Sequence, residues 1–588
     1  MEPEARRMPF SAVVWAVLLT ALVTAGLVAL GPAPRPAEGL FDAGDGLREL
    51  RDRWWYVGWL LLPPALLAFL GTGSRGAWLR GPRGLAVGVA VLALGALGLL
   101  THLGPCAWPY PWHGFGGPAI AGRLLAAWGL ERWGGRPRVA LALGALGGLL
   151  VARAASFVWL DPAHVPYPLH FAFVADELLA PAAGRPPLGG YVPTYTALLG
   201  WPPVPLIVGL GLEPVGVVCA YLWALTLATL GLVLAALVRL GGWRHLGLYA
   251  LVVGGMPLMH DACTPEAGLH LASYLPVWPV RLVVPAASLG LLAAWRSRAE
   301  PGARGAAGLG ALAALAVLCN VDFGAVDLVA SLACVALFAW QARRPGWLGA
   351  FLGAAGLVWG SWLLLHAWSF GRLPDWAGPL KFLRLFAEQG FLNVAMAPLG
   401  LHTVAAGFAA LCLWAAVPAI LRGVRDARLD ALAFAALFAL GTLAYFTGRS
   451  LDAVLAVGSG LPLATCAALW ATVRAERPGW PLEGDGGGLP GRLLGLLPVA
   501  TLVASLASHP TSWQPPQQGP YPRREAPPLP ATLPAGTATF ARDGNLWTLR
   551  WGLRNSLQLD HPFHLVGPAW ADCWCEDLAR ATPPALWV

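Results

Sequence analysis

The chain alternates between apolar runs of about 20 residues and short polar connections, and a run of that length spans a bilayer as an α-helix. Roughly 13 to 15 membrane-spanning helices are therefore predicted. The predicted spans lie near 11–31, 55–71, 84–101, 117–131, 138–159, 216–238, 245–259, 280–295, 305–319, 325–341, 347–366, 402–421, 429–446, 452–473 and 490–508. We keep the short run 117–131, which contains Arg123, because the alternation of inner and outer connections fails without it.

Basic residues gather on alternate connections, which is the positive-inside pattern of a protein with many membrane spans. The pattern places the N-terminus in the cytoplasm and the C-terminus outside, and we expect the inner membrane of a bacterial cell. Residues 11–31 are interpreted as an uncleaved first helix. The clusters are Arg75, Arg80 and Arg83; Arg132, Arg136 and Arg138; Arg239 and Arg244; Arg296, Arg298 and Arg304; Arg343 and Arg344; and Arg422, Arg425 and Arg428.

Composition supports an all-α polytopic membrane protein, since 57% of the residues are hydrophobic and only 12% are charged. The formal net charge of +8 does not indicate a nucleic-acid partner, because the surplus lies on the inner connections. Most of the nine cysteines fall inside apolar runs as small hydrophobic residues. Cys573 and Cys575 form a C-x-C, and Cys106 and Cys263 both lie on predicted outer loops; whether either pair forms a disulfide stays open.

Four regions follow from this pattern: N-terminal helices over 1–137, a membrane core over 138–475, an inner loop with the last helix over 476–508, and an outer C-terminal region over 509–588. The core carries two long outer loops, 160–215 and 367–401. The C-terminal region opens with a proline-rich stretch and continues with a tryptophan-rich patch.

The loop after the fifth predicted helix concentrates polar and aromatic residues. Asp161 lies immediately beyond the helix, and an amphipathic segment over roughly 168–182 is predicted to form an interfacial helix. Gly184-Arg-Pro-Pro then forms a turn, and Tyr191-Val-Pro193-Thr-Tyr195 leads back to the membrane. Asp176 and Glu177 are expected on the solvated face of the interfacial helix, with a site role as the alternative.

This arrangement resembles the first large outer loop of GT-C-type membrane glycosyltransferases, which use sugars carried on polyprenyl phosphate. The resemblance covers about residues 138–475 and implies a GT-C-like fold, with a long outer loop that bears interfacial helices. It places the family's acid at Asp161, the turn at Gly184-Arg-Pro-Pro, and the return at Tyr191 to Tyr195. It further implies membrane lipid and a polyprenyl-phosphate sugar donor as partners, with a glycan or protein as acceptor.

Glycosyl transfer needs a carboxylate to accept the proton of the acceptor hydroxyl and cationic help for the departing phosphate. Asp161 is the candidate base, and the alternative is a solvated helix end. His164 and His170 are candidates for binding substrate hydroxyls or a metal, or are ordinary interfacial histidines. A divalent cation, Mg²⁺ or Mn²⁺, would bind at Asp161 and Asp322 if one takes part.

Two arginines break the charge pattern because they lie at outer helix mouths. Arg281 is expected at the mouth of the helix near 280–295, and Arg449 at the end of the helix near 429–446. A guanidinium fork fits a phosphate group, so both are candidate donor-phosphate ligands, with snorkelling toward lipid headgroups as the alternative. Lys381 lies on an amphipathic run that is either a lipid-surface helix or a donor-binding loop.

Asn320-Val-Asp322-Phe-Gly324-Ala-Val-Asp327 joins two predicted spans through a tight outer turn. Acids this close to the apolar core are costly, so a role for Asp322 and Asp327 is expected. They would shape the pocket, bind a metal or pair with an arginine; the alternative is that Asn320 and Asp322 cap the helix ends. The chain as a whole is predicted to be a glycosyltransferase, with a transporter or flippase of lipid or lipid-linked sugar, or a non-catalytic assembly protein, as the alternatives.

Overall fold

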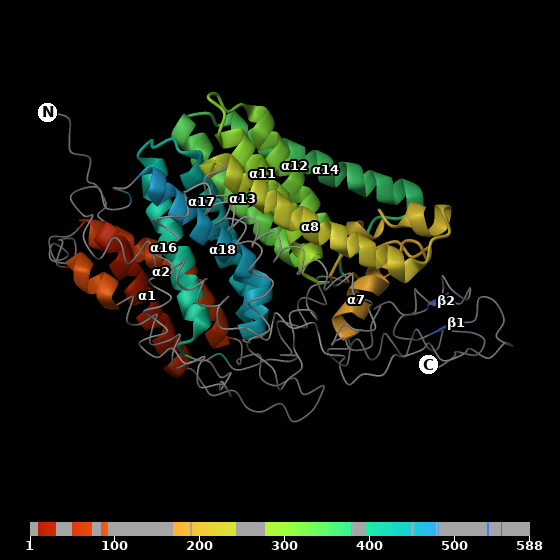
Figure 1. The fold of residues 1–588 in the computed structure, drawn as a ribbon, viewed down its shortest axis with the longest axis horizontal. Coiled ribbons are helices and arrows are strands. Elements are labelled where there is room, and N and C mark those ends of the chain that lie inside the picture. The colour runs from red at the N-terminus through yellow and green to blue at the C-terminus, as the bar shows by residue number, and fades with distance from the viewer. Residues whose placement is uncertain are drawn as a thin grey trace, which may run out of the picture.

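The computed structural model consists of long helices packed side by side (Figure 1). It describes residues 10–30, 50–72, 84–91, 168–188, 191–193, 195–242, 277–377, 380, 396, 398–447, 452–477, 480, 538–539 and 554–555. The helices are α1 (Phe10–Leu30), α2 (Leu50–Thr72), α7 (Pro168–Leu179), α8 (Pro214–Gly241), α11 (Val277–Arg296), α12 (Ala303–Cys319), α13 (Val321–Ala342), α14 (Gly346–Phe370), α16 (Leu401–Leu421), α17 (Ala427–Thr447) and α18 (Asp452–Glu476).

Two short helical elements and one strand pair are also described. A 3-10 turn, η4 (Leu198–Gly200), and a single π-helical turn, η5 (Pro205–Gly209), precede α8. The two-residue strands β1 (Ala538–Thr539) and β2 (Arg554–Asn555) pair in parallel. They are the described residues of the C-terminal region 509–588, so its predicted tryptophan-rich patch lies outside the described residues.

Among the described residues, seven helices are long and apolar enough to cross a membrane, namely α1, α8, α11, α13, α14, α16 and α17. Large apolar side chains on them face outward, among them Leu364 (74% exposed) and Trp368 (85% exposed) on α14. Exposed apolar area of this extent is expected where lipid covers the protein. The chain is therefore an integral multi-pass membrane protein, as composition predicted.

Each predicted span that lies wholly within the described residues coincides with a helix. The span near 84–101 is described only as a helical segment over 84–91, and those near 117–131, 138–159, 245–259 and 490–508 lie outside the described residues. The predicted domain boundaries are not tested by these helices and stay predictions.

The central helix is α17, which contacts α18, α16, α13 and α11 (Figure 1). On one side of it, α11 packs against α8 and α12, and α12 against α13 and α14; on the other, α16 leads to the α1–α2 pair. Most side chains of α17 are buried, from Leu429 to Phe446. Because α11, α13, α17 and α18 meet here, polar groups on them are removed from lipid as well as from water.

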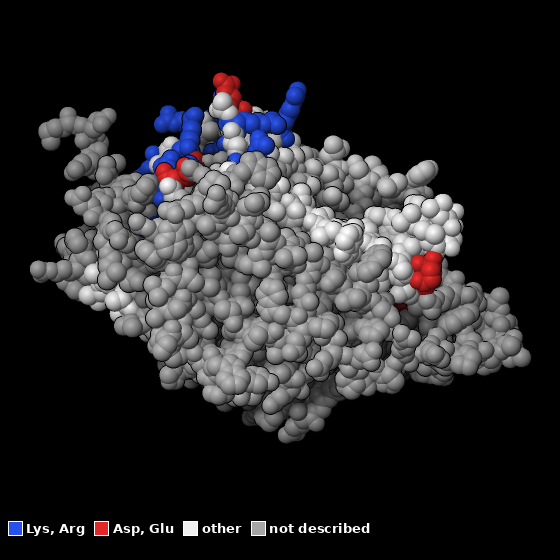
Figure 2. Space-filling model, viewed as in Figure 1, with Lys and Arg blue, Asp and Glu red and all other residues white. Residues whose placement is uncertain are grey.

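Exposed arginines gather at one end of the described helices, seen in blue at the top of Figure 2. They lie on the short connections α11–α12, α13–α14 and α16–α17 or in the first turn of the following helix, and include Arg298, Arg304, Arg343, Arg344, Arg422 and Arg425. The chain reverses direction at each short connection, so alternate connections lie at the same end of the helices. We call this side the basic end; the α12–α13 turn and the start of α11 lie at the opposite end.

Small residues allow α12 and α14 to approach closely. Ala306, Gly310 and Ala314 on α12 are spaced four residues apart and are buried, which is the small-residue pattern of helix contacts in membranes. A Cβ atom at Gly310 would overlap the backbone carbonyl of Phe351 on α14.

We expect Gly310→Ala to lower the stability of the protein by about 1–3 kcal/mol, because backbone atoms cannot move aside as a side chain can. The midpoint of thermal unfolding in detergent measures this effect. Gly353→Ala on α14 is the matched control, since nothing lies within 4 Å of the added methyl group. Equal midpoints for the two variants would contradict the close α12–α14 contact.

Candidate functional site

Arg281 lies in the second turn of α11, at the end opposite the basic end, and its side chain is only 3% exposed. Three rings surround the guanidinium group: Cζ lies 4.3 Å from the ring centroid of Tyr445, 5.0 Å from that of Phe323 and 5.3 Å from that of Tyr195. The rings come from α17, α13 and the segment after α7. Cation–π contacts hold the group in place and can contribute about 2 kcal/mol where water is excluded.

The hydrogen-bonding capacity of Arg281 is only partly used. Its Nε and Nη1 atoms are buried and have no hydrogen-bond partner among the described residues. Asp322, one residue before Phe323 on α13, is partly exposed and attracts the guanidinium electrostatically. A buried N–H group without an acceptor costs about 1–3 kcal/mol, so this arrangement favours an additional anionic or polar ligand.

The rings of Tyr195, Phe323 and Tyr445 form an aromatic box around Arg281. Tyr195, one wall of this box, is held in place by the carboxylate of Glu177 on α7. The backbone N–H groups of Tyr195 and Thr196 donate to Glu177 Oε2 over 2.9 and 2.7 Å. The ring of Tyr195 also stacks on Phe173 of α7, with 5.9 Å between centroids. Glu177 therefore orders the returning segment.

The prediction that Asp176 and Glu177 form a solvated face of α7 is wrong, because both are buried, 3% and 2% exposed. The helix itself, predicted over roughly 168–182, is confirmed as Pro168–Leu179. Sequence periodicity identified an amphipathic helix. It could not show that the backbone of the returning segment covers the polar side of this helix and donates N–H groups to the carboxylate of Glu177.

Tyr191 and Asn320 tie the same segment to its surroundings. The hydroxyl of Tyr191 donates to the carbonyl oxygen atoms of Glu177 and Thr196, at 3.2 and 3.4 Å. Asn320 Nδ2 donates to the carbonyl of Tyr195 at 2.7 Å, and its Oδ1 accepts from the N–H of Phe323 at 2.9 Å. The cap interpretation of Asn320 is thus confirmed, and the same side chain also positions the wall of the box.

Asp327 lies deeper in α13 and is fully buried. Ser288 on α11, about two helical turns after Arg281, donates a hydrogen bond of 2.8 Å to Asp327 Oδ2. The described residues that were predicted for the site therefore fall into two groups. Asn320, Asp322 and Tyr191 lie near the box around Arg281, whereas Asp327 forms a separate polar contact with Ser288 within the bundle.

Other predicted site residues lie outside the described residues: Asp161, His164, Lys381 and Arg449. The backbone of His170 is in α7, and its side chain is not described. Whether Asp161 and Arg449 converge on Arg281 stays a prediction.

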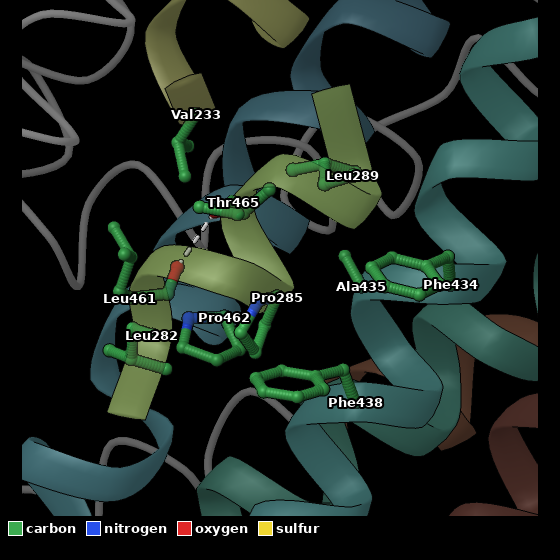
Figure 3. A pocket seen from close by; sticks show the side chains of 11 residues that line it. Val233, Leu282, Pro285, Leu289, Phe434, Ala435, Phe438, Leu461, Pro462 and Thr465 are labelled. Atoms are coloured by element: carbon green, nitrogen blue, oxygen red, sulfur yellow. Dashed lines mark hydrogen bonds between the residues drawn. The ribbon is translucent and has the colours of Figure 1, made fainter. Parts of the chain in front are cut away.

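An apolar pocket lies within the helical bundle (Figure 3). Its lining comes from α8, α11, α17 and α18, and includes Leu282, Pro285, Phe438, Leu461 and Pro462. A proline has no N–H to donate to the carbonyl four residues earlier, so α11 at Pro285 and α18 at Pro462 each have a locally weakened backbone at the pocket wall. Arg281 is not among the residues that line this pocket.

Sequence reasoning missed the ion pair at the basic end. Arg296, assigned to a loop cluster, is the last residue of α11, and its Nε lies 2.6 Å from Asp430 Oδ2 on α17. Arg296 also donates to Gln341 Oε1 at 3.1 Å, and Gln341 Nε2 donates to the carbonyls of Ile420 and Val424. This network joins the ends of α11, α13, α16 and α17.

Comparison of the chain with protein-family models, with curated proteins and with solved structures finds no match.

Proposed function

We propose that the chain is a membrane glycosyltransferase that moves a sugar from a polyprenyl-phosphate donor to an acceptor, a glycan or a protein, on the outer membrane face. The observation that supports this proposal most is Arg281, buried among three aromatic rings, with its Nε and Nη1 atoms lacking a hydrogen-bond partner among the described residues. Guanidinium groups bind phosphate through two parallel hydrogen bonds, which suits the phosphate of such a donor.

In the proposed reaction, an acceptor hydroxyl attacks the anomeric carbon of the donor sugar and its proton passes to the carboxylate of Asp161. The bond from the anomeric carbon to the phosphate oxygen breaks, and the phosphate leaves with the electron pair. Arg281 and Arg449 neutralise the charge that grows on this phosphate, and Asp322 orients Arg281. Attack from the face opposite the leaving group inverts the anomeric configuration.

A divalent cation, if one takes part, would be coordinated by the carboxylates of Asp161 and Asp322. Within the described ranges, no three or more His, Cys, Asp or Glu side chains form a metal-binding group, so Asp322 would be a single described ligand. We therefore assign no step to a metal.

The topology that goes with this function puts the basic end in the cytoplasm, following the positive-inside rule. Arg281 and the α12–α13 turn then face outward, as do the C-terminal residues, and the N-terminus is cytoplasmic. A GT-C-like core with a bacterial inner-membrane location is part of the same proposal.

The test is sugar transfer by the purified full-length chain from a polyprenyl-phosphate sugar. Asp161→Asn is expected to leave the elution profile and thermal midpoint unchanged and to reduce turnover by about 10²- to 10⁴-fold, the usual contribution of a general base. Glu300→Gln, at an exposed acid of the basic end, is the matched control and is expected to keep full activity. An active Asp161→Asn enzyme would rule out this base.

A second candidate, a transporter or flippase of the same lipid-linked sugar, is favoured by the buried acids Asp327 and Asp430 on spanning helices, since such groups mark ion pathways in many membrane proteins. Movement of a labelled donor lipid across proteoliposomes without formation of a glycosylated product would favour this candidate over the enzyme.

A further inference from the structure

Three acidic residues on the spanning helices α13 and α17 differ in what compensates their charge. Asp322 lies near Arg281, and Asp430 pairs with Arg296. Asp327 forms no ion pair with a basic side chain in the described part of the chain. Its one hydrogen-bond partner there is the hydroxyl of Ser288.

Asp327 on α13 and two serines, Ser288 on α11 and Ser331 on α13, carry buried side-chain oxygen atoms. The Oδ1 atom of Asp327 is buried without a hydrogen-bond partner in the described ranges, and so is Oγ of Ser331, one turn farther along α13. Both residues are 0% exposed, as is Ser288. Pro285, between Arg281 and Ser288 on α11, leaves the carbonyl of Arg281 without its usual helical donor. Oxygens of this kind, at a proline-interrupted helix, are typical cation ligands within membranes.

A carboxylate buried without a counter-charge is strongly unfavourable. Its charge must be cancelled by a proton or by a small cation. A single carboxylate carries one negative charge, so the matching ion is monovalent, and two serine hydroxyls can complete its shell with lone pairs that are otherwise unused.

We propose that Asp327, Ser288 and Ser331 form a binding site for a monovalent cation of the size of Na⁺ between α11 and α13. The ion would join the helix that carries Arg281 to the helix that carries Asp322 and Phe323. Occupancy of the site therefore stabilises the bundle and the box around Arg281. This proposal does not depend on sugar transfer, because it rests on other side chains.

The experiment compares thermal unfolding of the full-length protein in NaCl, LiCl, KCl and choline chloride at equal ionic strength. An ion that binds only the folded state stabilises it by mass action, so we expect the wild-type midpoint in saturating NaCl to exceed that in choline chloride by about 3 °C or more. Asp327→Asn is expected to lose this difference. Ser331→Ala, which removes only one hydroxyl, is expected to fold normally and to need about tenfold more Na⁺ for the same shift.

Asp375→Asn is the control, since Asp375 is an exposed acid in the connection after α14, and it should keep the full Na⁺ effect. Binding of ²²Na⁺ to wild type and its loss in Asp327→Asn give a second readout. A wild-type midpoint equal in NaCl and choline chloride would mean that Asp327 holds only a proton, and would overturn the proposal, as would a retained Na⁺ effect in Asp327→Asn. The Asp161→Asn variant should keep the Na⁺ effect, so failure of the proposed enzyme and failure of the cation site give different results.

Discussion

Replacing Arg281 with glutamine is expected to lower the rate of sugar transfer from a polyprenyl-phosphate donor by about 100-fold or more. In the proposed reaction, glutamine would remove the positive charge that faces the departing phosphate, and one preorganised donor of this kind contributes about 2.7–4 kcal/mol to the transition state. The measurement is turnover at saturating donor. Arg298→Gln, at an exposed arginine of the basic end, is the control and should retain full activity.

A loss of activity in Arg281→Gln has a second explanation, because the change also leaves Asp322 without its nearby positive charge. The double variant Arg281→Gln/Asp322→Asn separates the two. If Arg281 only balances the charge of Asp322, the double variant recovers both stability and activity. If Arg281 holds the donor phosphate, stability recovers and activity does not. Recovery of activity in the double variant would contradict the phosphate assignment.

Asp430→Ala is expected to destabilise the protein by about 3–5 kcal/mol, the usual result of breaking a buried ion pair on one side only. Arg296 would stay buried against Phe338, with 4.5 Å from its Cζ to the ring centroid, and would keep only Gln341 as a described hydrogen-bond acceptor. The midpoint of thermal unfolding measures the loss.

The double variant Arg296→Met/Asp430→Leu tests the cause of that loss. Apolar replacement of both partners is often neutral or stabilising, so most of the lost stability should return. Glu300→Ala serves as the surface control, expected to change stability by no more than about 0.5 kcal/mol. If Asp430→Ala unfolds at the same temperature as this control, the ion pair does not hold α11 to α17.

The spanning helices were predictable because a run of apolar residues has to satisfy its backbone internally in lipid, whatever its neighbours are. The tight α12–α13 turn and the cap at Asn320 were predictable for a similar reason, since they depend on residues close in sequence. The five cysteines Cys219, Cys319, Cys334, Cys412 and Cys466 are buried as free thiols, which agrees with their place in apolar runs.

Polar contacts between distant helices were not predictable. Ser288 and Asp327 are 39 residues apart, and Arg296 and Asp430 are 134 apart. Hydropathy predicts where each helix lies in the sequence, but not which helices pack against it or which of its faces they contact. It therefore cannot predict which polar side chains meet. Glu177 shows the same limit, because its partners are the backbone N–H groups of a loop.

The candidate site was predicted in part. Arg281 was singled out because it lies apart from the basic connections, and the structure adds its aromatic box and its nearness to Asp322. Tyr195 lies in the returning segment noted in the sequence, but its contact with Arg281, and that of Tyr445, depends on how α7, α11 and α17 pack. The roles of Asp161 and Arg449 rest on the sequence alone.

The proposed function depends most on whether Arg281 recognises the phosphate of a lipid. Native mass spectrometry of the full-length protein with polyprenyl phosphate and with the matching polyprenol compares two ligands that differ only in that group. We expect wild type to bind the phosphate at least about tenfold more tightly, because a charge-assisted hydrogen bond contributes about 1.5–3 kcal/mol, and Arg281→Gln to bind both ligands equally. Equal affinity in the wild type, or an unchanged preference in Arg281→Gln, would contradict the proposed function.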